Sequence, residues 1–238
     1  MITKRFDVNT DGSDYIVGDI HGCYDQLIAK LDDVGFDRSV DRLFSVGDIF
    51  DRGPKPIEMI RLAQEPWFHM VQGNHEELAY NALIELIGRD SMTWVNNGGD
   101  WILPIVDRAN EGDPDEYNEV IQFLSDVVSA LPLAFEIPMA SGKRVGVVHA
   151  EVPNSIWEPD RWERGLGRHE RATFMWARDR VMHDIDTTIS GVDFVVSGHS
   201  IIQEPDWYGN QLAIDCGMYL TGRVYLVRVG TDSLEIIK

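Results

Sequence analysis

Three short apolar runs, each ending at a Gly-Asp or Gly-Asn step, constrain the fold of this chain most. The steps that end the runs are Gly18-Asp19, Gly47-Asp48 and Gly73-Asn74. After each step, apolar residues recur at helical spacing, which predicts helices over 23–34, from Pro54 onward, and over 76–87. A strand, a loop and a helix repeated three times predict an α/β fold whose strands pair in parallel.

The second half of the chain has a different pattern. Apolar runs that predict strands lie at 144–148, 194–196, 212–214 and 224–229. Short connections, with Gly209-Asn210 as a turn, favour antiparallel pairing among them. Between the two halves, residues 107–119 contain six carboxylates and one base, which predicts an acidic surface loop, and a helical stretch follows at 117–130. We therefore expect a single domain over residues 1–238 with a helical cap insertion at about 90–135.

The charge balance limits the partners of the protein. Its 238 residues carry 40 Asp and Glu against 21 Lys and Arg, a formal net charge of −19, which argues against a broad face for nucleic acid or for a membrane surface. The two cysteines, Cys23 and Cys216, are too few for a disulfide framework and are typical of packed thiols in a reducing compartment. Neither a secretory signal nor a membrane-spanning stretch is predicted, so we expect a cytoplasmic protein.

Polar residues with metal-binding chemistry follow five of the predicted strands. They are Asp19 and His21, Asp48, Asn74 and His75, His149, and His199. Ligands of open α/β sheets bind beyond the carboxyl ends of the strands, so these side chains can converge on one crevice. Carboxylate, imidazole and amide without thiolate suit Mn²⁺, Fe²⁺ or Zn²⁺. This many ligands exceed the needs of one tetrahedral ion and suit two ions that share a bridging carboxylate.

Three motifs of the chain resemble those of a known family. Gly-Asp-Ile-His-Gly at 18–22, Gly-Asp-Ile-Phe-Asp-Arg-Gly at 47–53 and Gly-Asn-His-Glu at 73–76 are similar to the motifs of calcineurin-like metallophosphoesterases, in the phosphoprotein phosphatase branch. Further matches lie at 148–150, 176–178 and 197–199, so the resemblance to small phage and bacterial members covers nearly the whole chain. It implies a metallophosphoesterase sandwich, two mixed β-sheets flanked by helices.

The resemblance also implies a role for each site residue. Asp19, His21 and Asp48 would hold the first metal ion, and Asp48, Asn74, His149 and His199 the second, with Asp48 as the bridge. His75 matches the general acid, Asp51 the carboxylate that orients it, and Arg52 and Arg178 the arginines that bind the substrate phosphate. Two divalent ions are implied, with Mn²⁺ as the expected metal and Fe or Zn as alternatives.

The activity that the resemblance implies is a serine/threonine protein phosphatase, with phosphotyrosine as a further substrate, acting by direct attack of a metal-bridging hydroxide. Its partner would be a phosphoprotein or a small phosphate ester. The alternative is a symmetrical diadenosine tetraphosphatase, because those hydrolases have similar signatures. Glu76 favours the phosphatase, since the tetraphosphatases more often have Asp there. A scaffold that only binds anions would usually have lost a ligand or the acid, and this chain has kept them all.

For the remaining residues, the sequence either predicts a structural role or leaves two interpretations open. Residues 161–180 have a net charge of +3, which fits either a rim that attracts an anionic substrate or an arginine-rich helix paired with the acidic cap. Three tryptophans are expected to serve core or cap packing, and three histidines to be structural or surface residues. They are Trp94, Trp101 and Trp176, and His69, His169 and His183. The sequence leaves open the physiological substrate, the Ser/Thr or Tyr preference, the native metal pair and the oligomeric state.

Overall fold

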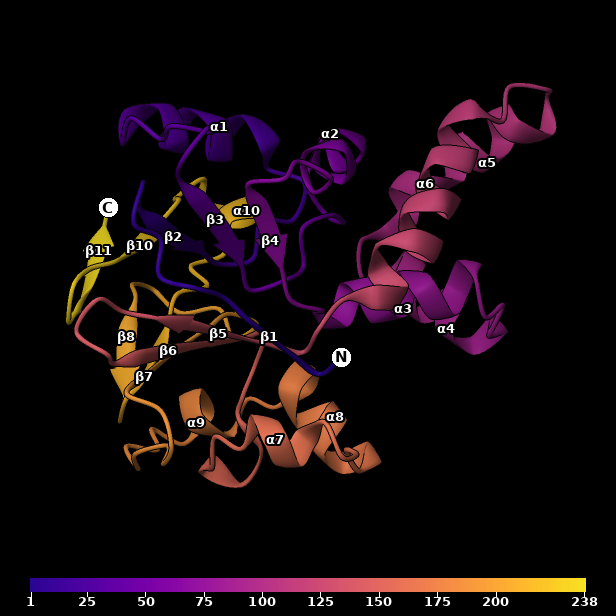
Figure 1. Cartoon of the computed structure of the whole chain (residues 1–238). Coiled ribbons are helices and arrows are strands. Elements are labelled where there is room, and N and C mark those ends of the chain that lie inside the picture. The colour runs from indigo at the N-terminus through magenta and orange to yellow at the C-terminus, as the bar shows by residue number, and fades with distance from the viewer.

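The computed structural model describes residues 1–238, apart from the side chains of Arg89 and Asp90. Two β-sheets lie face to face with helices on their outer sides, and a group of helices extends from one side of the sheets (Figure 1). This arrangement confirms the predicted α/β sandwich of two mixed sheets. Among the described residues, no helix combines the length and apolar character that crossing a bilayer requires.

The first three predicted strands lie in a five-stranded sheet. Its strands, in spatial order, are β11 (Leu234–Ile237), β10 (Leu226–Val229), β2 (Asp14–Val17), β3 (Arg42–Ser45) and β4 (Phe68–Met70). β2, β3 and β4 pair in parallel, as predicted, whereas β10 runs antiparallel to β2 and β11. The connecting helices are α1 (Tyr24–Asp33) and α2 (Pro56–Leu62). Their buried residues, such as Leu27 and Met59, cover the outer face of this sheet.

The second sheet has six strands and corrects one expectation. In spatial order they are β1 (Thr3–Arg5), β5 (Ala134–Pro138), β6 (Arg144–Val148), β7 (Phe194–Ser197), β9 (Gln211–Ala213) and β8 (Asp206–Tyr208). The antiparallel expectation is wrong for β6, β7 and β9, which pair in parallel, whereas β9 runs antiparallel to β8, a strand that was not predicted. The reason is the connection from β6 to β7, which is a long helical crossover and not a hairpin.

The helices of that crossover cover the second sheet. They are η3 (Pro153–Ser155), α7 (Pro159–Trp162), α8 (Arg168–Trp176) and α9 (Asp179–Met182). Trp157, Trp162 and Phe174 pack edge to face beneath them in a buried cluster with β7. A separate cluster that includes Ile16 and Phe135 fills the space between the two sheets. The last helix, α10 (Met218–Thr221), follows β9.

The region between the two halves is helical. Its elements are α3 (Asn74–Leu83), α4 (Gly88–Asn96), η1 (Gly99–Ile102), α5 (Leu103–Asn110), α6 (Asp115–Asp126) and η2 (Val128–Ala130). The expected acidic loop at 107–119 is wrong for most of its length, because only 111–114 connects α5 to α6. Asp115 and Glu116 lie in the first turn of α6, where carboxylates stabilise the helix dipole. The domain boundaries given above stay a prediction.

Candidate metal centre and active site

The predicted ligands converge where strands of both sheets end. Asp19 and His21 follow β2, Asp48 follows β3, Asn74 begins α3 after β4, and His149 and His199 follow β6 and β7. Each of these side chains is buried, with at most 5% of its surface exposed. The backbone N–H of His199 donates to both oxygens of Asp19, which ties the loops after β7 and β2 together.

Asp48 lies at the centre of two groups of potential ligands. Its Oδ2 is 3.8 Å from Nε2 of His21 and 3.5 Å from Nε2 of His149. One group combines Asp48 with His149 and His199, and the other combines it with His21 and His75. In each group the candidate ligand atoms lie within 4.8 Å of one another, which is close enough to surround one ion. Membership of both groups fits the bridging position expected for Asp48.

Backbone carbonyls orient two of the histidines. Nδ1 of His21 lies 3.0 Å from the carbonyl oxygen of Phe50, and Nδ1 of His149 lies 2.9 Å from that of Val46. A proton on each Nδ1 satisfies these carbonyls and leaves the Nε2 lone pair facing Asp48, which is the usual support of a metal-binding histidine. Burial lowers the pKa of His21 to about 3, so its imidazole is neutral, the form that binds metal.

The chemistry of the site fits divalent cations. Four buried acidic residues lie close to the ligand groups, namely Asp19, Asp48, Glu76 and Asp215. Burial, together with Asp215 and Asp48, raises the pKa of Asp19 well above its ordinary value, and burial raises that of Asp215 to about 6. Such repulsion between buried acids is what a bound cation relieves. Nε2 of His199 is also among the few described buried side-chain atoms with no hydrogen-bond partner.

Asp215 is a site residue that the sequence analysis missed. It follows β9, on the same side as the other ligands, and its carboxylate accepts the backbone N–H of Gly217 at 2.9 Å. The pattern that revealed the other positions, an acid directly after an apolar run, is present at Leu212-Ala-Ile-Asp215.

His75 and Asp51 form a buried pair. Nδ1 of His75 lies 2.6 Å from Oδ2 of Asp51, and both side chains are almost completely buried. Burial alone would lower the pKa of His75, but Asp48 and the hydrogen bond to Asp51 outweigh it and raise this pKa above its ordinary value. A histidine held in this way keeps a proton that it can transfer, as a general acid requires.

Arg52 lies across His21 and His75, the two histidines of the second group. Its guanidinium lies 2.9 Å from Nε2 of His21 and 2.9 Å from Nε2 of His75, and it stacks over the ring of Tyr219 at 4.9 Å. Arg178, after α8, donates to the carbonyl oxygen of His199 at 2.7 Å. Both arginines therefore border the ligands from opposite groups, where an anion between them could be gripped.

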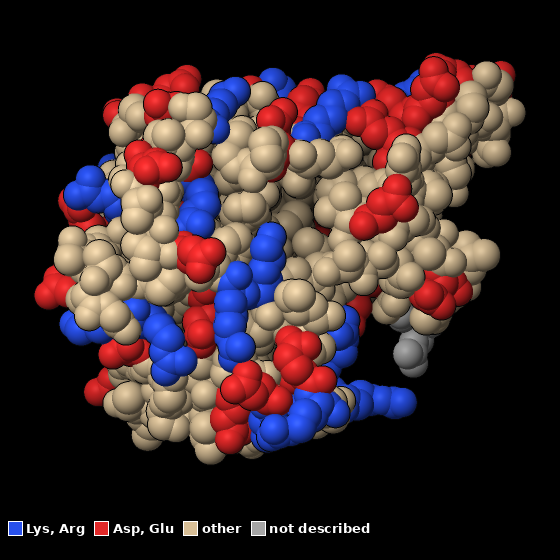
Figure 2. All heavy atoms as spheres, viewed as in Figure 1, with Lys and Arg blue, Asp and Glu red and all other residues tan. Residues whose placement is uncertain are grey.

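The other arginines of residues 161–180 are largely occupied elsewhere. Arg161 pairs with Glu158 and Glu170, and Arg171 contacts Glu77 and Gln72. Figure 2 shows acidic and basic side chains side by side over α7 and α8. Among the described side chains, the suggested pairing with the acidic cap is not found, and the cap acids Glu119 and Glu116 bind Arg61 and Arg108 instead.

Arg180 of the same segment is a structural residue. It is 2% exposed, and its guanidinium donates to the carbonyl oxygens of Thr187 and Tyr208. These bonds hold the coil before β7 to the β8–β9 turn. Arg164 and Arg168 are exposed and lie outside the ligand groups.

Two tryptophans expected to serve only packing contact the acid pair directly. The indole N–H of Trp94 donates to Oδ2 of Asp51 at 2.8 Å, and that of Trp101 to Oδ1 at 2.6 Å. No periodicity or spacing connects these positions, which lie 43 and 50 residues from Asp51. Trp176 also makes contacts beyond apolar packing, because its indole donates to Glu77 and the centroid of its ring lies 6.3 Å from that of His199.

Glu76 holds the backbone at Asp48, the expected bridging residue, in place. One carboxylate oxygen accepts the backbone N–H groups of Asp48 and Gly73, and the other accepts that of Ile49. From the sequence, Glu76 was expected only to distinguish the phosphatases from the tetraphosphatases. Its position three residues after Gly73, at the start of α3, is the signal of a capping box that could have indicated this role.

Backbone strain is concentrated at the site. Several residues other than glycine have left-handed backbones here, and they are His21, Asp48, Asp51, Arg52 and His199. Such conformations cost free energy and persist where the surrounding contacts enforce them. The glycines allow close approach as expected: a Cβ on Gly73 would lie 2.2 Å from Oδ1 of Asp48, and one on Gly198 would lie 2.0 Å from Oδ1 of Asp19.

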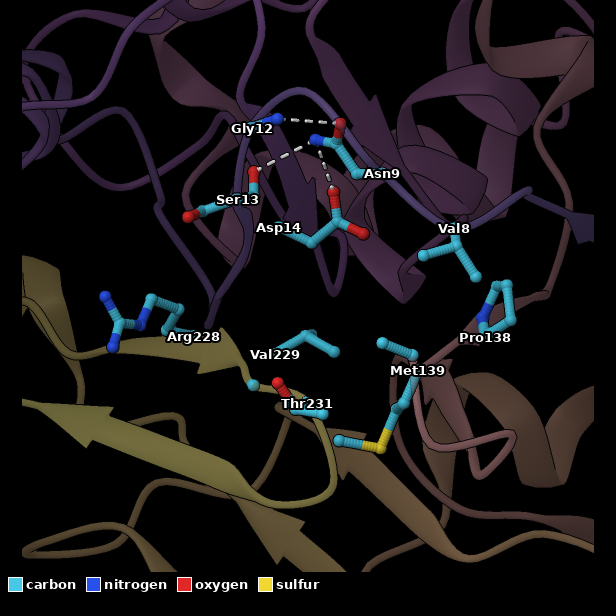
Figure 3. Close-up of a pocket in the computed structure, with 12 residues that line it drawn as sticks. Val8, Asn9, Gly12, Ser13, Asp14, Pro138, Met139, Arg228, Val229 and Thr231 are labelled. Carbon is cyan, nitrogen blue, oxygen red and sulfur yellow. Dashed lines mark hydrogen bonds between the residues drawn. The ribbon is translucent and has the colours of Figure 1, made fainter.

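A separate cavity of about 330 Å³ lies at the opposite ends of the strands. Asn9 and Asp14 line one wall and Met139 and Val229 face them, as Figure 3 shows. Asp14 is paired with Arg42 through two hydrogen bonds, so its charge is already neutralised. None of the predicted site residues borders this cavity.

Comparison with known proteins agrees with the geometry. A serine/threonine-protein phosphatase 2 of Salmonella typhimurium is 32% identical over 233 residues, which cover 96% of this chain and 99% of that protein. The protein of the same name from Escherichia coli is 32% identical over 90% of this chain. A symmetrical bis(5'-nucleosyl)-tetraphosphatase of Klebsiella pneumoniae is 46% identical, but over only 66 residues, 27% of this chain and 23% of that protein.

Solved structures share the fold over nearly the whole chain. A candidate diadenosine tetraphosphatase aligns with a TM-score of 0.66 at 21% identity, covering 99% of this chain and 96% of that one. A serine/threonine phosphatase from Saccharomyces cerevisiae aligns with a TM-score of 0.63 at 14% identity, covering 100% and 83%. The family model for calcineurin-like phosphoesterases matches residues 15–203, which include every predicted ligand and the acid pair. This chain is therefore a member of the calcineurin-like phosphoesterase family.

Proposed function

We propose that the protein is a metal-dependent serine/threonine protein phosphatase that cleaves phosphomonoesters at a site with two divalent ions. The observation that carries this proposal is the acid pair of His75 and Asp51 beside a carboxylate, Asp48, shared by two ligand groups. Relatives that bear the phosphatase name over 90% or more of this chain support the substrate class. The two buried free thiols, Cys23 and Cys216, support a cytoplasmic location.

Each residue has a distinct task in the proposed reaction. Asp19, His21 and Asp48 would hold one ion, and Asp48, Asn74, His149 and His199 the other. When bound, the two ions would supply an activated water and neutralise charge on the phosphoryl group. Mn²⁺ is the expected metal because carboxylate, imidazole and amide ligands suit it, with Fe or Zn as alternatives.

The remaining steps belong to side chains that touch the substrate. Arg52 and Arg178 would grip the phosphoryl oxygens, since a planar guanidinium binds two oxygens at once. His75 would give a proton to the leaving alkoxide from Nε2, while Asp51 holds the ring through Nδ1. Arg52 contacts Nε2 of His75, so a phosphate bound by Arg52 lies next to the proton donor.

A parallel assay tests the substrate class. Purified protein with Mn²⁺ should hydrolyse a phosphoserine peptide with a higher kcat/KM than diadenosine tetraphosphate, and a phosphotyrosine peptide measured beside them fixes the Ser/Thr preference. A preference for diadenosine tetraphosphate would replace the proposal with the alternative. His75→Asn protein from the same preparation controls for contaminating phosphatases.

A further inference from the structure

The carboxylate of Asp51 is completely enclosed by donors. It is 0% exposed, and both of its oxygens accept hydrogen bonds. Oδ2 accepts from Nδ1 of His75 at 2.6 Å and from the indole of Trp94 at 2.8 Å, while Oδ1 accepts from the indole of Trp101 at 2.6 Å. Three hydrogen-bond donors, two at Oδ2 and one at Oδ1, therefore fix the orientation of the carboxylate. Rotating the carboxylate would break both indole bonds.

The two tryptophans come from a segment that belongs to neither sheet. Trp94 lies in the last turn of α4 and Trp101 in η1, and residues 97–98 connect these two helices next to Arg52. The carbonyl oxygen of Gly98 accepts the backbone N–H of Arg52 at 2.9 Å, and that of Asn97 accepts Nε of Arg52 at 3.3 Å. One short stretch of the cap region thus contacts the orienting carboxylate and the neighbouring arginine together.

These contacts hold a strained backbone. Asp51 and Arg52 are consecutive residues with φ values of 72° and 62°, a left-handed conformation that residues other than glycine rarely adopt. Strain of this kind persists only where neighbouring groups enforce it. The bonds from residues 94–101 are made to these two residues, so this segment is well placed to enforce the conformation.

Indole groups suit this task for a chemical reason. An indole N–H donates and does not accept, and it carries no charge. Trp94 and Trp101 therefore orient Asp51 without cancelling the negative charge that His75 needs as a partner, whereas an arginine there would cancel it. The rings are also rigidly packed, because they meet edge to face with centroids 5.9 Å apart and Trp94 is 1% exposed.

We propose that Trp94 and Trp101 are positioning residues for phosphoester hydrolysis, which act by fixing the carboxylate of Asp51 so that Asp51 fixes the ring of His75. The cap region is then a working part of the catalytic apparatus. The proposal rests on the proposed function for the role of His75, but the two indole bonds can be tested without any activity.

The kinetic test removes each indole donor and keeps an aromatic ring. Trp94→Phe and Trp101→Phe should each lower kcat for a phosphoserine peptide by about 10-fold to 100-fold, less than the full 10²–10⁴-fold contribution of general acid catalysis because His75 remains, with KM changed by less than about 2-fold. For nitrophenyl phosphate, whose leaving group needs no proton, kcat should fall by less than about 3-fold. Losses that are equal on both substrates would overturn the proposal.

A matched control lies in the buried cluster beneath the crossover helices α7, α8 and α9. The indole of Trp157 donates to Oε2 of Glu136 at 2.7 Å, a buried indole–carboxylate bond of the same kind far from the site. Trp157→Phe should lower thermal stability, as Trp94→Phe and Trp101→Phe should. Its effect on kcat, however, should be the same for the phosphoserine peptide and for nitrophenyl phosphate. A leaving-group effect of the same size in this control would show that the kinetic signature reflects general destabilisation, and would overturn the proposal.

A double variant tests whether the tryptophans act through His75. If they do, Trp101→Phe should cost almost nothing further in protein that already carries His75→Asn, because residues acting as one unit are not additive. A full additional loss of 10-fold or more would contradict the proposal.

Nuclear magnetic resonance of ¹⁵N-labelled tryptophan side chains separates this proposal from the proposed function. Asp51→Asn should shift the indole N–H resonances of Trp94 and Trp101 and leave that of Trp157 in place. If the Asp51→Asn protein does not fold, the same resonances should show slow hydrogen exchange in the unaltered protein. Unshifted or rapidly exchanging resonances would refute the indole bonds, whereas intact bonds in a protein without phosphoserine phosphatase activity would refute only the proposed function.

Discussion

His75 is the residue at which proton transfer can be separated from metal binding. Its Nδ1 is held by Asp51, and its side chain is proposed as the acid and not as a ligand. His75→Asn should therefore retain both metal ions and lower kcat by about 10²–10⁴-fold for a phosphoserine peptide, with a much smaller loss for nitrophenyl phosphate. Kinetics on both substrates, with metal content from elemental analysis, check this expectation. Loss of one equivalent of metal would instead identify His75 as a ligand.

His69 allows a prediction about acid stability. It lies between the rings of Phe6 and Phe44, and burial, helped by Lys4 and Arg42, lowers its pKa to about 4. The unfolded chain, in which a histidine titrates near about 6.5, binds a proton first as the pH falls. The stabilising contribution of neutral His69 is therefore complete above a pH of about 6.5, and it is lost as the pH falls from about 6.5 to about 4.

The test compares His69→Phe with the same change at exposed His183. After a discount for partial exposure, His69→Phe should remove about 1–2 kcal/mol from the difference in unfolding free energy between pH 7 and pH 4.5. His183→Phe should leave that difference unchanged. Urea unfolding at the two pH values measures both, and an identical pH dependence in all three proteins would rule out this role for His69.

At the scale of elements, the connection between α4 and η1 requires a glycine. Gly98 has a φ of 109°, and a Cβ at this position would lie 2.5 Å from Cγ of Arg52. Gly98→Ala should therefore displace Arg52, raise KM for nitrophenyl phosphate by about 10-fold, and cost about 1–2 kcal/mol of stability. Steady-state kinetics and thermal unfolding measure the two effects.

Gly112, in the connection between α5 and α6, is the matched control. Its φ of 103° is similar, but a Cβ there would meet no atom within 4 Å. Gly112→Ala should show the stability cost of a left-handed alanine with an unchanged KM. If both variants raise KM equally, the contact between Gly98 and Arg52 is not the cause.

Elements whose signal is local were predictable from the sequence, and those defined by distant partners were not. The parallel strands β2, β3 and β4 each have an apolar run and a following helix, so their type and pairing could be predicted. β1, β5, β8 and β11 were missed, and for β1 and β8 the reason is that each has only three residues, two of them exposed. The parallel pairing of β6 with β7 was missed because the crossover helices α7 and α9 have only four residues each, and the residues of α8 were interpreted by their charge rather than by their periodicity.

The same distinction applies to the site. The ligands could be predicted because a metal demands particular residue types, and the strand ends bring those types together. The contacts of Trp94 and Trp101 with Asp51 could not, since an indole bond leaves no trace in spacing or composition. Asp215 is intermediate, because its position after β9 carried the signal, but it lies outside the motifs at 18–22, 47–53, 73–76, 148–150, 176–178 and 197–199.

For the molecule as a whole, metal binding should determine stability as well as activity. The buried acids Asp19, Asp48 and Asp215 repel one another without a cation, so Mn²⁺ at about 100 times its Kd should stabilise the fold by about 2–3 kcal/mol, or about 5–10 °C in Tm. A chelator should abolish hydrolysis of nitrophenyl phosphate, and Mn²⁺ should restore it more fully than Mg²⁺, which prefers oxygen ligands.

Calorimetry with and without metal checks the shift in Tm. Asp48→Asn, which alters the shared ligand, should lose most of the shift, whereas Asp37→Asn, an exposed change outside the site, should keep it. Full activity after dialysis against excess chelator would contradict the two-ion centre.

The bond between His199 and Asp19 also determines when a newly made molecule can become active. Its two residues are 180 positions apart in the chain. A ribosome releases the chain from its N-terminus, so the loop after β2 leaves the exit tunnel long before its partner exists. A growing chain therefore carries the acid pair of His75 and Asp51 without a complete site. Phosphoesterase activity can therefore begin only after residue 199 has been made and has folded against the loop after β2.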